Sequence, residues 1–196
     1  MAFSFAIAVM IASCSRKKTE SPAHHDKENI TATDTPTSIA TEIKVFENVD
    51  ASVKAQISNL FANYFALNNS FIEDNNDAAK AQAKTFLDTF EKFDMSKLVG
   101  DQMNFYHVQL AKITTSLKSI SESVDIEESR TQLSIVSEGM YALVKAYHSN
   151  EAELYYQFCP MAMNHEGAYW ISETKQILNP YMGQRMLTCG VTKEKL

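Results

Sequence analysis

Two Cys/Met pairs near the C-terminus carry the residue types best suited to chemistry in this sequence. Cys159 is followed two residues later by Met161, and Met186 precedes Cys189 by three, so the second pair reverses the order of the first. Thiolates and thioethers are polarisable donors that favour Cu(I) over hard ions such as Mg²⁺ or Ca²⁺. If the two segments meet, they offer up to two thiolates and two thioethers. A Met ligand distinguishes copper or silver from structural zinc, which is bound by Cys and His.

Three other interpretations of these residues stay open. Cys159 and Cys189 could form a disulfide that staples the C-terminal segment, which an oxidising compartment would permit. The methionines could fill gaps in a hydrophobic core. The segment, which also contains the single Trp of the chain, could form a peptide-binding groove lined with Met and aromatic side chains. The mirrored order of the two pairs favours the metal site over each of these.

Histidine could complete such a metal site. His107 lies among aromatic residues in a segment predicted to be helical. It could supply an imidazole if that helix backs the C-terminal segment. His165, between the two pairs, is more typical of an exposed turn than of an auxiliary ligand. His148 follows the last predicted helix, where a His suits the C-terminal end of the helix dipole.

Catalysis finds little support in the sequence. It contains no P-loop, no glycine-rich dinucleotide fingerprint and no pair of Glu-x-x-His motifs for a di-iron site. A nucleophile built from Cys159 and His107 can be written, but a following Pro and neighbouring Met are not what that chemistry requires. We therefore expect a protein that is not an enzyme.

Length, composition and charge favour one mainly helical domain. The chain has 196 residues, 45% of them hydrophobic, with only five Gly and four Pro. That is enough apolar material for one core, and the scarcity of Gly and Pro favours helices over a sandwich or barrel. The formal net charge of -6 argues against nucleic acid as a partner.

The N-terminal residues predict export and lipid attachment. Residues 3–12 form an apolar run that is too short to span a bilayer but suits a signal peptide, predicted over residues 1–13. The run ends in Ile-Ala-Ser-Cys, which resembles a bacterial lipobox and makes Cys14 the expected lipid attachment site. Residues 14–45 are polar and predict a disordered tether. We expect the protein on the periplasmic side of a cell membrane, most naturally the outer membrane. The alternative is a buried apolar strand, for which the polar tail offers no partner.

Apolar residues recur at three- and four-residue steps in four segments of residues 50–150. The expected helices span about 53–67, 77–90 with Asp77 as N-cap, 102–121 with Val108 on the apolar face, and 126–147. Short connections favour an antiparallel four-helix bundle. Residues 151–196 predict a small lobe of the same domain, with strands over 154–158, 168–171 and 186–189 separated by Gly and Pro turns. The fold class is mainly α, with Cys/Met ligands carried by this C-terminal lobe.

The C-terminal motif resembles that of an uncharacterised domain family. The family signature resembles Tyr-Tyr-x-x-Cys-Pro-Met-Ala, then Gly-Ala-x-Trp-Leu-Ser, then Ile-x-Asn-Pro-Tyr-Phe-Gly, then Met-Leu-x-Cys-Gly. This chain has Tyr155, Tyr156, Cys159, Pro160, Met161, Ala162, Gly167, Ala168, Trp170, Ser172, Ile177, Asn179, Pro180, Tyr181, Gly183, Met186, Leu187, Cys189 and Gly190. It departs at Ile171 for Leu and at Met182 for Phe. The resemblance extends back to about Val53 and includes His107, Arg130 and Ser137.

The resemblance implies a cellular location for the protein and a metal ion that it binds. The family occurs in small lipoproteins and at the C-terminal end of periplasmic adaptor subunits of heavy-metal (copper/silver) efflux pumps. It implies copper or silver handling outside the cytoplasm, with an efflux component or another copper protein as partner. We therefore expect a lipoprotein that captures or carries Cu(I) or Ag(I) through Cys159, Met161, Met186 and Cys189, with His107 as a further candidate. The alternative is a disulfide-stapled interaction module without metal.

Overall fold

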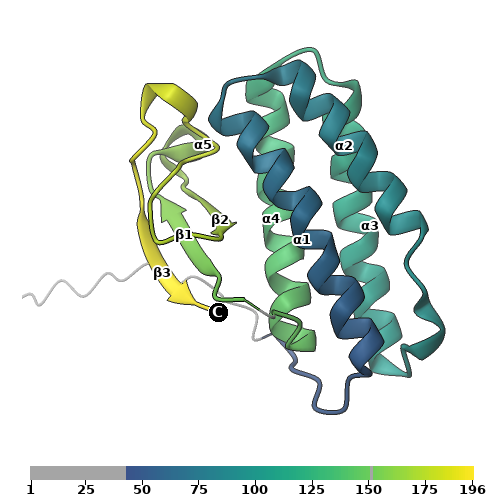
Figure 1. Cartoon of the computed structure of the whole chain (residues 1–196). Coiled ribbons are helices and arrows are strands. Elements are labelled where there is room, and N and C mark those ends of the chain that lie inside the picture. Colours follow the sequence, from purple (N-terminus) through teal and green to yellow (C-terminus); the bar gives the residue numbers. More distant parts are fainter. Residues whose placement is uncertain (1–42, 151) are drawn as a thin grey trace, which may run out of the picture. The chain divides into compact units, whose positions relative to one another are not determined.

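Four long helices and a small sheet make up residues 43–150 and 152–196, the part of the chain that the computed structural model describes (Figure 1). The helices are α1 (Ala51–Ile72), α2 (Asn76–Glu91), α3 (Asp101–Glu122) and α4 (Ile126–Tyr147), with a 3-10 turn η1 (Met95–Lys97). The C-terminal part contains β1 (Tyr155–Cys159), the turn α5 (Ala162–His165), β2 (Ala168–Ser172), the 3-10 turn η2 (Gly183–Arg185) and β3 (Val191–Lys195). The prediction of a mainly helical chain is confirmed. The predicted signal peptide, Cys14 and nearly all of the predicted tether lie outside the described residues.

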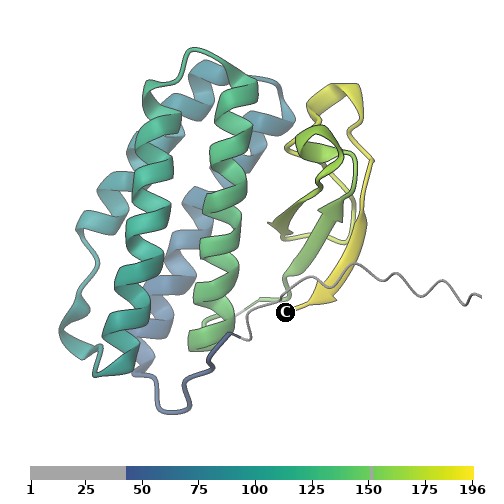
Figure 2. The same cartoon turned by 180° about the vertical axis from the view of Figure 1, so that it is seen from behind.

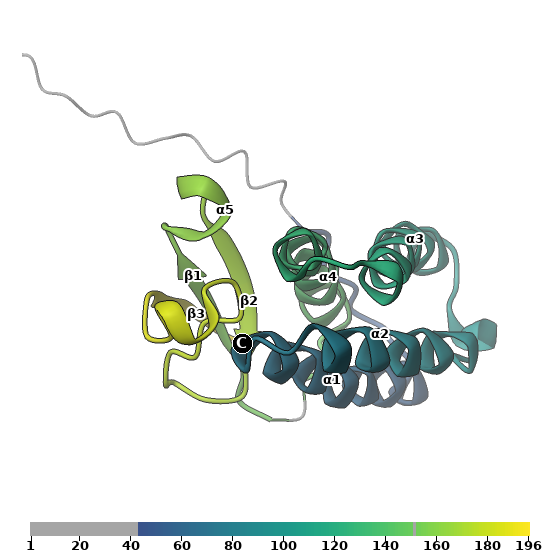
Figure 3. The ribbon, with the colours of Figure 1, turned by 90° about the horizontal axis from the view of Figure 1, so that it is seen from above.

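Each long helix packs against the next, and α1 also contacts α4, so the four helices enclose a common core (Figure 3). Side chains of Asp50, Asn75 and Asp125 cap the starts of α1, α2 and α4 by accepting backbone N–H bonds. The N-cap of α2 is therefore Asn75, and the prediction of Asp77 was wrong. His148 ends α4 in the left-handed conformation, with φ of 48°. Among the described residues, no helix is long and apolar enough to cross a membrane.

The buried side of α3 differs from the predicted one. Tyr106, Ile113 and Leu117 are fully buried, whereas 53% of Val108 is exposed. Residues two positions apart on a helix point to nearly opposite sides, so burying Tyr106 turns Val108 to solvent. The prediction of Val108 on the apolar face was wrong, because the aromatic ring rather than the smaller Val decides the orientation.

The three strands form one antiparallel sheet with β1 in the centre, in the order β2-β1-β3. Cys159 pairs with Ala168 on β2, and Phe158 pairs with Val191 on β3. The predicted third strand over residues 186–189 was wrong. These residues form a turn in which the Cys189 N–H donates to the Met186 carbonyl at 3.0 Å. A strand cannot run through this turn, and β3 begins only after it.

One face of the sheet packs against the helices (Figure 2). On this face the Tyr156 ring stacks on Tyr141 of α4 with centroids 3.9 Å apart. Glu194 of β3 accepts hydrogen bonds from the Tyr141 hydroxyl and the Lys145 ammonium, each at 2.6 Å. Because strand side chains alternate, Cys159 lies on the opposite face. The segment after β2 returns over that face, which places it above the buried cysteine.

Candidate functional site

The structure brings the two cysteines together. Cys159 is the last residue of β1 and is fully buried, while Cys189 follows η2 and is partly exposed. Their Sγ atoms are 3.1 Å apart, and both are free thiols. The two Cys/Met segments, thirty residues apart along the chain, therefore meet at their cysteines. The pair is reachable from solvent through Cys189 only.

Asn179 positions the turn that carries Cys189. This buried side chain donates from its amide nitrogen to the Cys189 carbonyl at 2.7 Å. Its amide oxygen accepts the backbone N–H groups of Tyr181 at 2.8 Å and Met182 at 3.2 Å. The next residue, Gly190, packs closely against Trp170. A Cβ at this position would lie 2.8 Å from the Trp170 ring, so a larger residue would not fit. The thiol pair thus rests on a rigid backbone frame rather than on a free loop.

Met161 and Met186 flank the cysteines without entering the core. Their side chains are 39% and 41% exposed. Met186 is linked to Cys189 through the turn hydrogen bond, and Met161 follows Cys159 by two residues. A methionine that fills a gap in a core is buried. The core-filling interpretation therefore does not describe these two residues.

The histidines are placed away from the thiol pair or at turns. His107 is exposed on α3, which packs against α2 and α4, whereas the sheet packs against α4. The structure does not bring His107 to the cysteines. His165 is exposed in the turn between β1 and β2. Within residues 43–150 and 152–196, no group of three or more His, Cys, Asp or Glu side chains is placed to hold a metal ion. The candidate ligands are therefore thiolates and thioethers.

The hydrogen bond with Cys159 raises the pKa of the Cys189 thiol, and partial burial acts in the same direction. A raised pKa keeps the thiol protonated and lowers its reactivity at neutral pH. It also means that a bound soft cation must displace a proton.

We expect alkylation of Cys189 in the metal-free protein to require a higher pH than that of an ordinary thiol, whose pKa is about 8.5. Cys159→Ser should move the midpoint of the alkylation rate toward that ordinary value, because a hydroxyl carries no negative charge in this range. The rate of iodoacetamide reaction at Cys189, followed by mass spectrometry between pH 7 and 11, measures both midpoints. Equal midpoints in the two proteins would show that Cys159 does not hold the Cys189 proton.

A buried arginine anchors the segment that precedes the Cys189 turn. Arg130 of α4 donates to the carbonyls of Pro180 and Phe71, each at 3.0 Å, and to Glu127 at 2.7 Å. It also pairs with Asp74, at the end of α1. Partial burial acts to raise the pKa of Asp74, but hydrogen bonds from the Gln184 backbone and Arg130 lower it below its usual value. One side chain therefore ties together α1, α4 and the loop before η2.

A second buried network ties the sheet to the helices. Tyr64 of α1 shares a hydrogen bond of 2.8 Å with Ser137 of α4 and accepts the Ile171 N–H of β2 at 3.1 Å. The Tyr181 hydroxyl donates to the Tyr169 carbonyl at 2.6 Å. The local pattern of helices and strands gave no indication of these contacts. Arg130 and Ser137 were marked only by the family resemblance.

We expect Gly183→Ala to lower the free energy of unfolding by about 2 to 4 kcal/mol. Gly183 has φ of +52°, and a Cβ there would lie 2.0 Å from Asp74 Oδ1 and 2.6 Å from Arg130 Nη2. Gly100→Ala is the matched control, because Gly100 has the same φ of +52° with nothing within 4 Å. Gly100 has φ of 52° and ψ of -121°, a conformation that only Gly adopts readily, so the control should lose about 1 to 3 kcal/mol from backbone strain alone. The loss should stay below that of Gly183→Ala, which adds the clash with Asp74 and Arg130. Equal losses in urea denaturation would show that the crowding at Gly183 has no energetic role.

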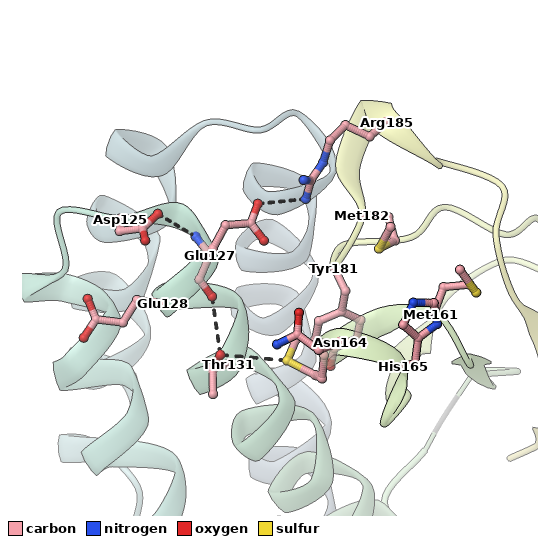
Figure 4. Close-up of a pocket in the computed structure, with 11 residues that line it drawn as sticks. Asp125, Glu127, Glu128, Thr131, Met161, Asn164, His165, Tyr181, Met182 and Arg185 are labelled. Carbon is pink, nitrogen blue, oxygen red and sulfur yellow. Dashed lines mark hydrogen bonds and ion pairs between the residues drawn. The ribbon is translucent and has the colours of Figure 1, made fainter. Parts of the chain in front are cut away.

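A cavity of about 650 Å³ opens between the start of α4, the turn between β1 and β2, and η2 (Figure 4). Its lining includes Met161, Met163, Met182 and His165. Met163, Asn164 and His165 all have positive φ, at 50°, 54° and 74°. The left-handed conformation costs a residue with a side chain about 1 to 2 kcal/mol. Three such residues in succession are the most strained backbone among the described residues.

The architecture defines a class: a bundle of four helices joined to a three-stranded sheet that carries a pair of thiols. Residues 60–152 match the family described as "Protein of unknown function (DUF3347)". The match runs from α1 through α4 and ends before β1, so the cysteines lie beyond it. Comparisons with curated proteins and with solved structures found no match. The expectation of an uncharacterised domain family is confirmed, whereas its link to lipoproteins and efflux adaptors stays a prediction.

Proposed function

We propose that this protein binds Cu(I) or Ag(I) as cargo through the thiolates of Cys159 and Cys189, with Met161 and Met186 as thioether donors. The single observation that carries the proposal is the contact between the two Sγ atoms at 3.1 Å, reached from segments with mirrored Cys/Met order. Two thiolates side by side are a soft donor pair. His107 is left out of the ligand set, because α3 does not pack against the sheet.

The geometry suits a carrier better than a permanent structural site. Cys159 is buried while Cys189 and Met186 are partly open, so one side of a bound cation would stay accessible to an incoming ligand. Stepwise exchange with the donors of a partner protein could then proceed without unfolding of the domain. Binding must release thiol protons, so affinity should rise with pH. No catalytic step is part of this proposal.

The proposed location and partner rest on the sequence. The apolar run before Cys14 and the polar residues after it support a lipid-anchored protein on the periplasmic side, in the outer membrane. The resemblance of the C-terminal motif supports delivery to a heavy-metal efflux component or another copper protein. The family match to residues 60–152 is compatible with this assignment but carries no function of its own.

A second candidate function is a disulfide-stapled interaction module, and the same sulfur contact favours it. The two thiols are close enough to be oxidised with a small movement of either side chain, and an extracytoplasmic compartment would permit it. The staple would then fix the Cys189 turn to β1. The exposed Met161 and Met186 and the partly exposed Phe158 and Tyr169 would serve to bind a partner protein.

Alkylation of the protein purified without reductant tests the proposal, with each Cys peptide followed separately by mass spectrometry. The proposal predicts that Cys159 and Cys189 are both modified in the unfolded metal-free protein. In the folded protein, where burial already shields Cys159, one equivalent of Cu(I) or Ag(I) should protect Cys189. Modification only after reduction would establish the staple. Thiols that are free but unprotected by either cation would contradict the metal proposal.

A further inference from the structure

We propose a second soft-cation site in the cavity beside η2, formed by the thioethers of Met161, Met163 and Met182 and the imidazole of His165. All four side chains line the same cavity of about 650 Å³. In the view of Figure 4, Met161, His165 and Met182 all lie on the side of the cavity that faces away from α4. Thioether and imidazole donors without a thiolate suit Ag(I) and Cu(I). Neither cysteine lines the cavity, but Met161 is also a donor of the proposed thiol site, so Met163, Met182 and His165 are the donors that distinguish the two sites.

The methionines of this cavity are not placed as core residues. Met161 is 39% exposed, and Met163 and Met182 are partly exposed. Met163 and Met182 pack against the edge of the hydrophobic core, and the Met163 sulfur accepts a hydrogen bond from the Thr131 hydroxyl of α4 at 3.8 Å. Methionine has three rotatable side-chain bonds and can bring its sulfur to a cation with little movement of the backbone.

The backbone of the turn between β1 and β2 holds two of the donors in an unfavourable conformation. Met163 and His165 both lie in the left-handed region, with Asn164 between them. Asn and His tolerate this conformation better than most residues do, whereas Met adopts it rarely. Strained residues persist where the surrounding structure holds them, and such residues cluster at binding sites. The strain places both side chains at the cavity instead of along a regular hairpin.

The opposite wall of the cavity is acidic. Asp125, Glu127 and Glu128 lie across it at the start of α4 (Figure 4). Arg185 pairs with Glu127 at 2.8 Å, and Arg130 pairs with the same carboxylate, so two carboxylates are left without a cationic partner in this wall. Their field would attract any cation, and the soft donors facing them would select Ag(I) or Cu(I). Met161, two residues after Cys159, is shared by this site and the proposed thiol site.

Ag(I) titration of the full chain with all three cysteines changed to Ser tests the site, with the methyl groups of Met labelled with ¹³C and followed by NMR. Ag(I) is stable without a reductant, and each methionine methyl group gives its own NMR signal. The expected result is that one equivalent of Ag(I) shifts the methyl signals of Met161, Met163 and Met182 and leaves Met103 on α3 unmoved. The same titration of the wild-type chain is the second measurement. The first equivalent should bind at the thiol site and move Met161, and the second should move Met163 and Met182.

Variants separate this site from the proposed thiol site. Met163→Leu with Met182→Leu should weaken Ag(I) binding by about tenfold or more in the chain without cysteines. Met103→Leu is the matched control and should change nothing. In the chain that keeps its cysteines, the double Met variant should leave Ag(I) protection of Cys189 intact. Unmoved methyl signals in both titrations, or shifts confined to methionines outside the cavity, would overturn the proposal whatever the thiols do.

Discussion

Arg130→Ala should lower the free energy of unfolding by about 3 to 5 kcal/mol. Arg130 is 1% exposed, and its guanidinium satisfies the Pro180 and Phe71 carbonyls as well as Asp74 and Glu127. Truncation removes the Arg130 donor from the Pro180 carbonyl, leaves the Phe71 carbonyl with only the Asp74 N–H at 3.2 Å, and leaves the Asp74 carboxylate without its cation. Each loss adds to the cost. Urea denaturation followed by circular dichroism measures the change. The loss should appear as a shift of one cooperative unfolding transition, because Arg130 joins the helices to the loop before η2.

Arg185→Ala is the matched control for that prediction. Arg185 pairs with the same Glu127 at 2.8 Å, but its side chain is 60% exposed. Exposed ion pairs contribute about 0 to 1 kcal/mol, so the variant should unfold almost as the wild type does. Similar losses in both variants would contradict the central role of the buried arginine. A loss below about 1 kcal/mol in Arg130→Ala would contradict it as well.

The change of both Cys159 and Cys189 to Ser should weaken Cu(I) binding about a thousandfold or more, which corresponds to about 4 kcal/mol. A hydroxyl is a hard and poor ligand for Cu(I), so the two strongest donors of the proposed site are lost together. Each single variant should lose part of this affinity. Anaerobic equilibrium dialysis against a Cu(I) buffer at several chelator ratios measures the dissociation constants.

Cys14→Ser is the control for thiol content, because Cys14 lies outside the proposed metal site. Urea denaturation of the double variant in the absence of metal separates lost ligands from lost structure. A double variant that folds and keeps the wild-type affinity for Cu(I) would exclude the thiol pair as the binding site. The cavity methionines and His165 would then be the next candidate donors for Cu(I).

The helices could be predicted from the sequence because the apolar pattern that indicates each helix lies within its own segment. Apolar residues at three- and four-residue steps predicted all four, and α4 begins at Ile126 and ends at Tyr147 as expected. The buried side of α3 was less well predicted, because the choice between Tyr106 and Val108 depends on which ring fits between α2 and α4. The third strand was misplaced for a related reason. Residues 186–189 are apolar, yet they turn back toward Asn179, a contact that no local pattern shows.

The candidate site was predictable only in part. The mirrored order of the Cys/Met pairs indicated that the cysteines meet, which their sulfur contact agrees with. The position of His107 depended on the order of helices around the core, which its aromatic neighbours do not encode. The burial of Arg130 could not be inferred from a helix pattern either, because a charged residue usually faces solvent. Met163 and His165 share a cavity through a left-handed turn, which has no sequence signal beyond Asn164.

The measurement that tests the central claim most directly is a competition titration of the full chain with Cu(I) and a chromophoric Cu(I) chelator, under anaerobic reducing conditions. The account predicts that the wild-type protein withdraws Cu(I) from the chelator in a stoichiometric ratio, and that the Cys159→Ser, Cys189→Ser variant does not compete at the same chelator concentration. A wild-type chain with reduced thiols that takes no copper at any ratio would contradict the account. The protein would then be an interaction module whose partner remains to be isolated.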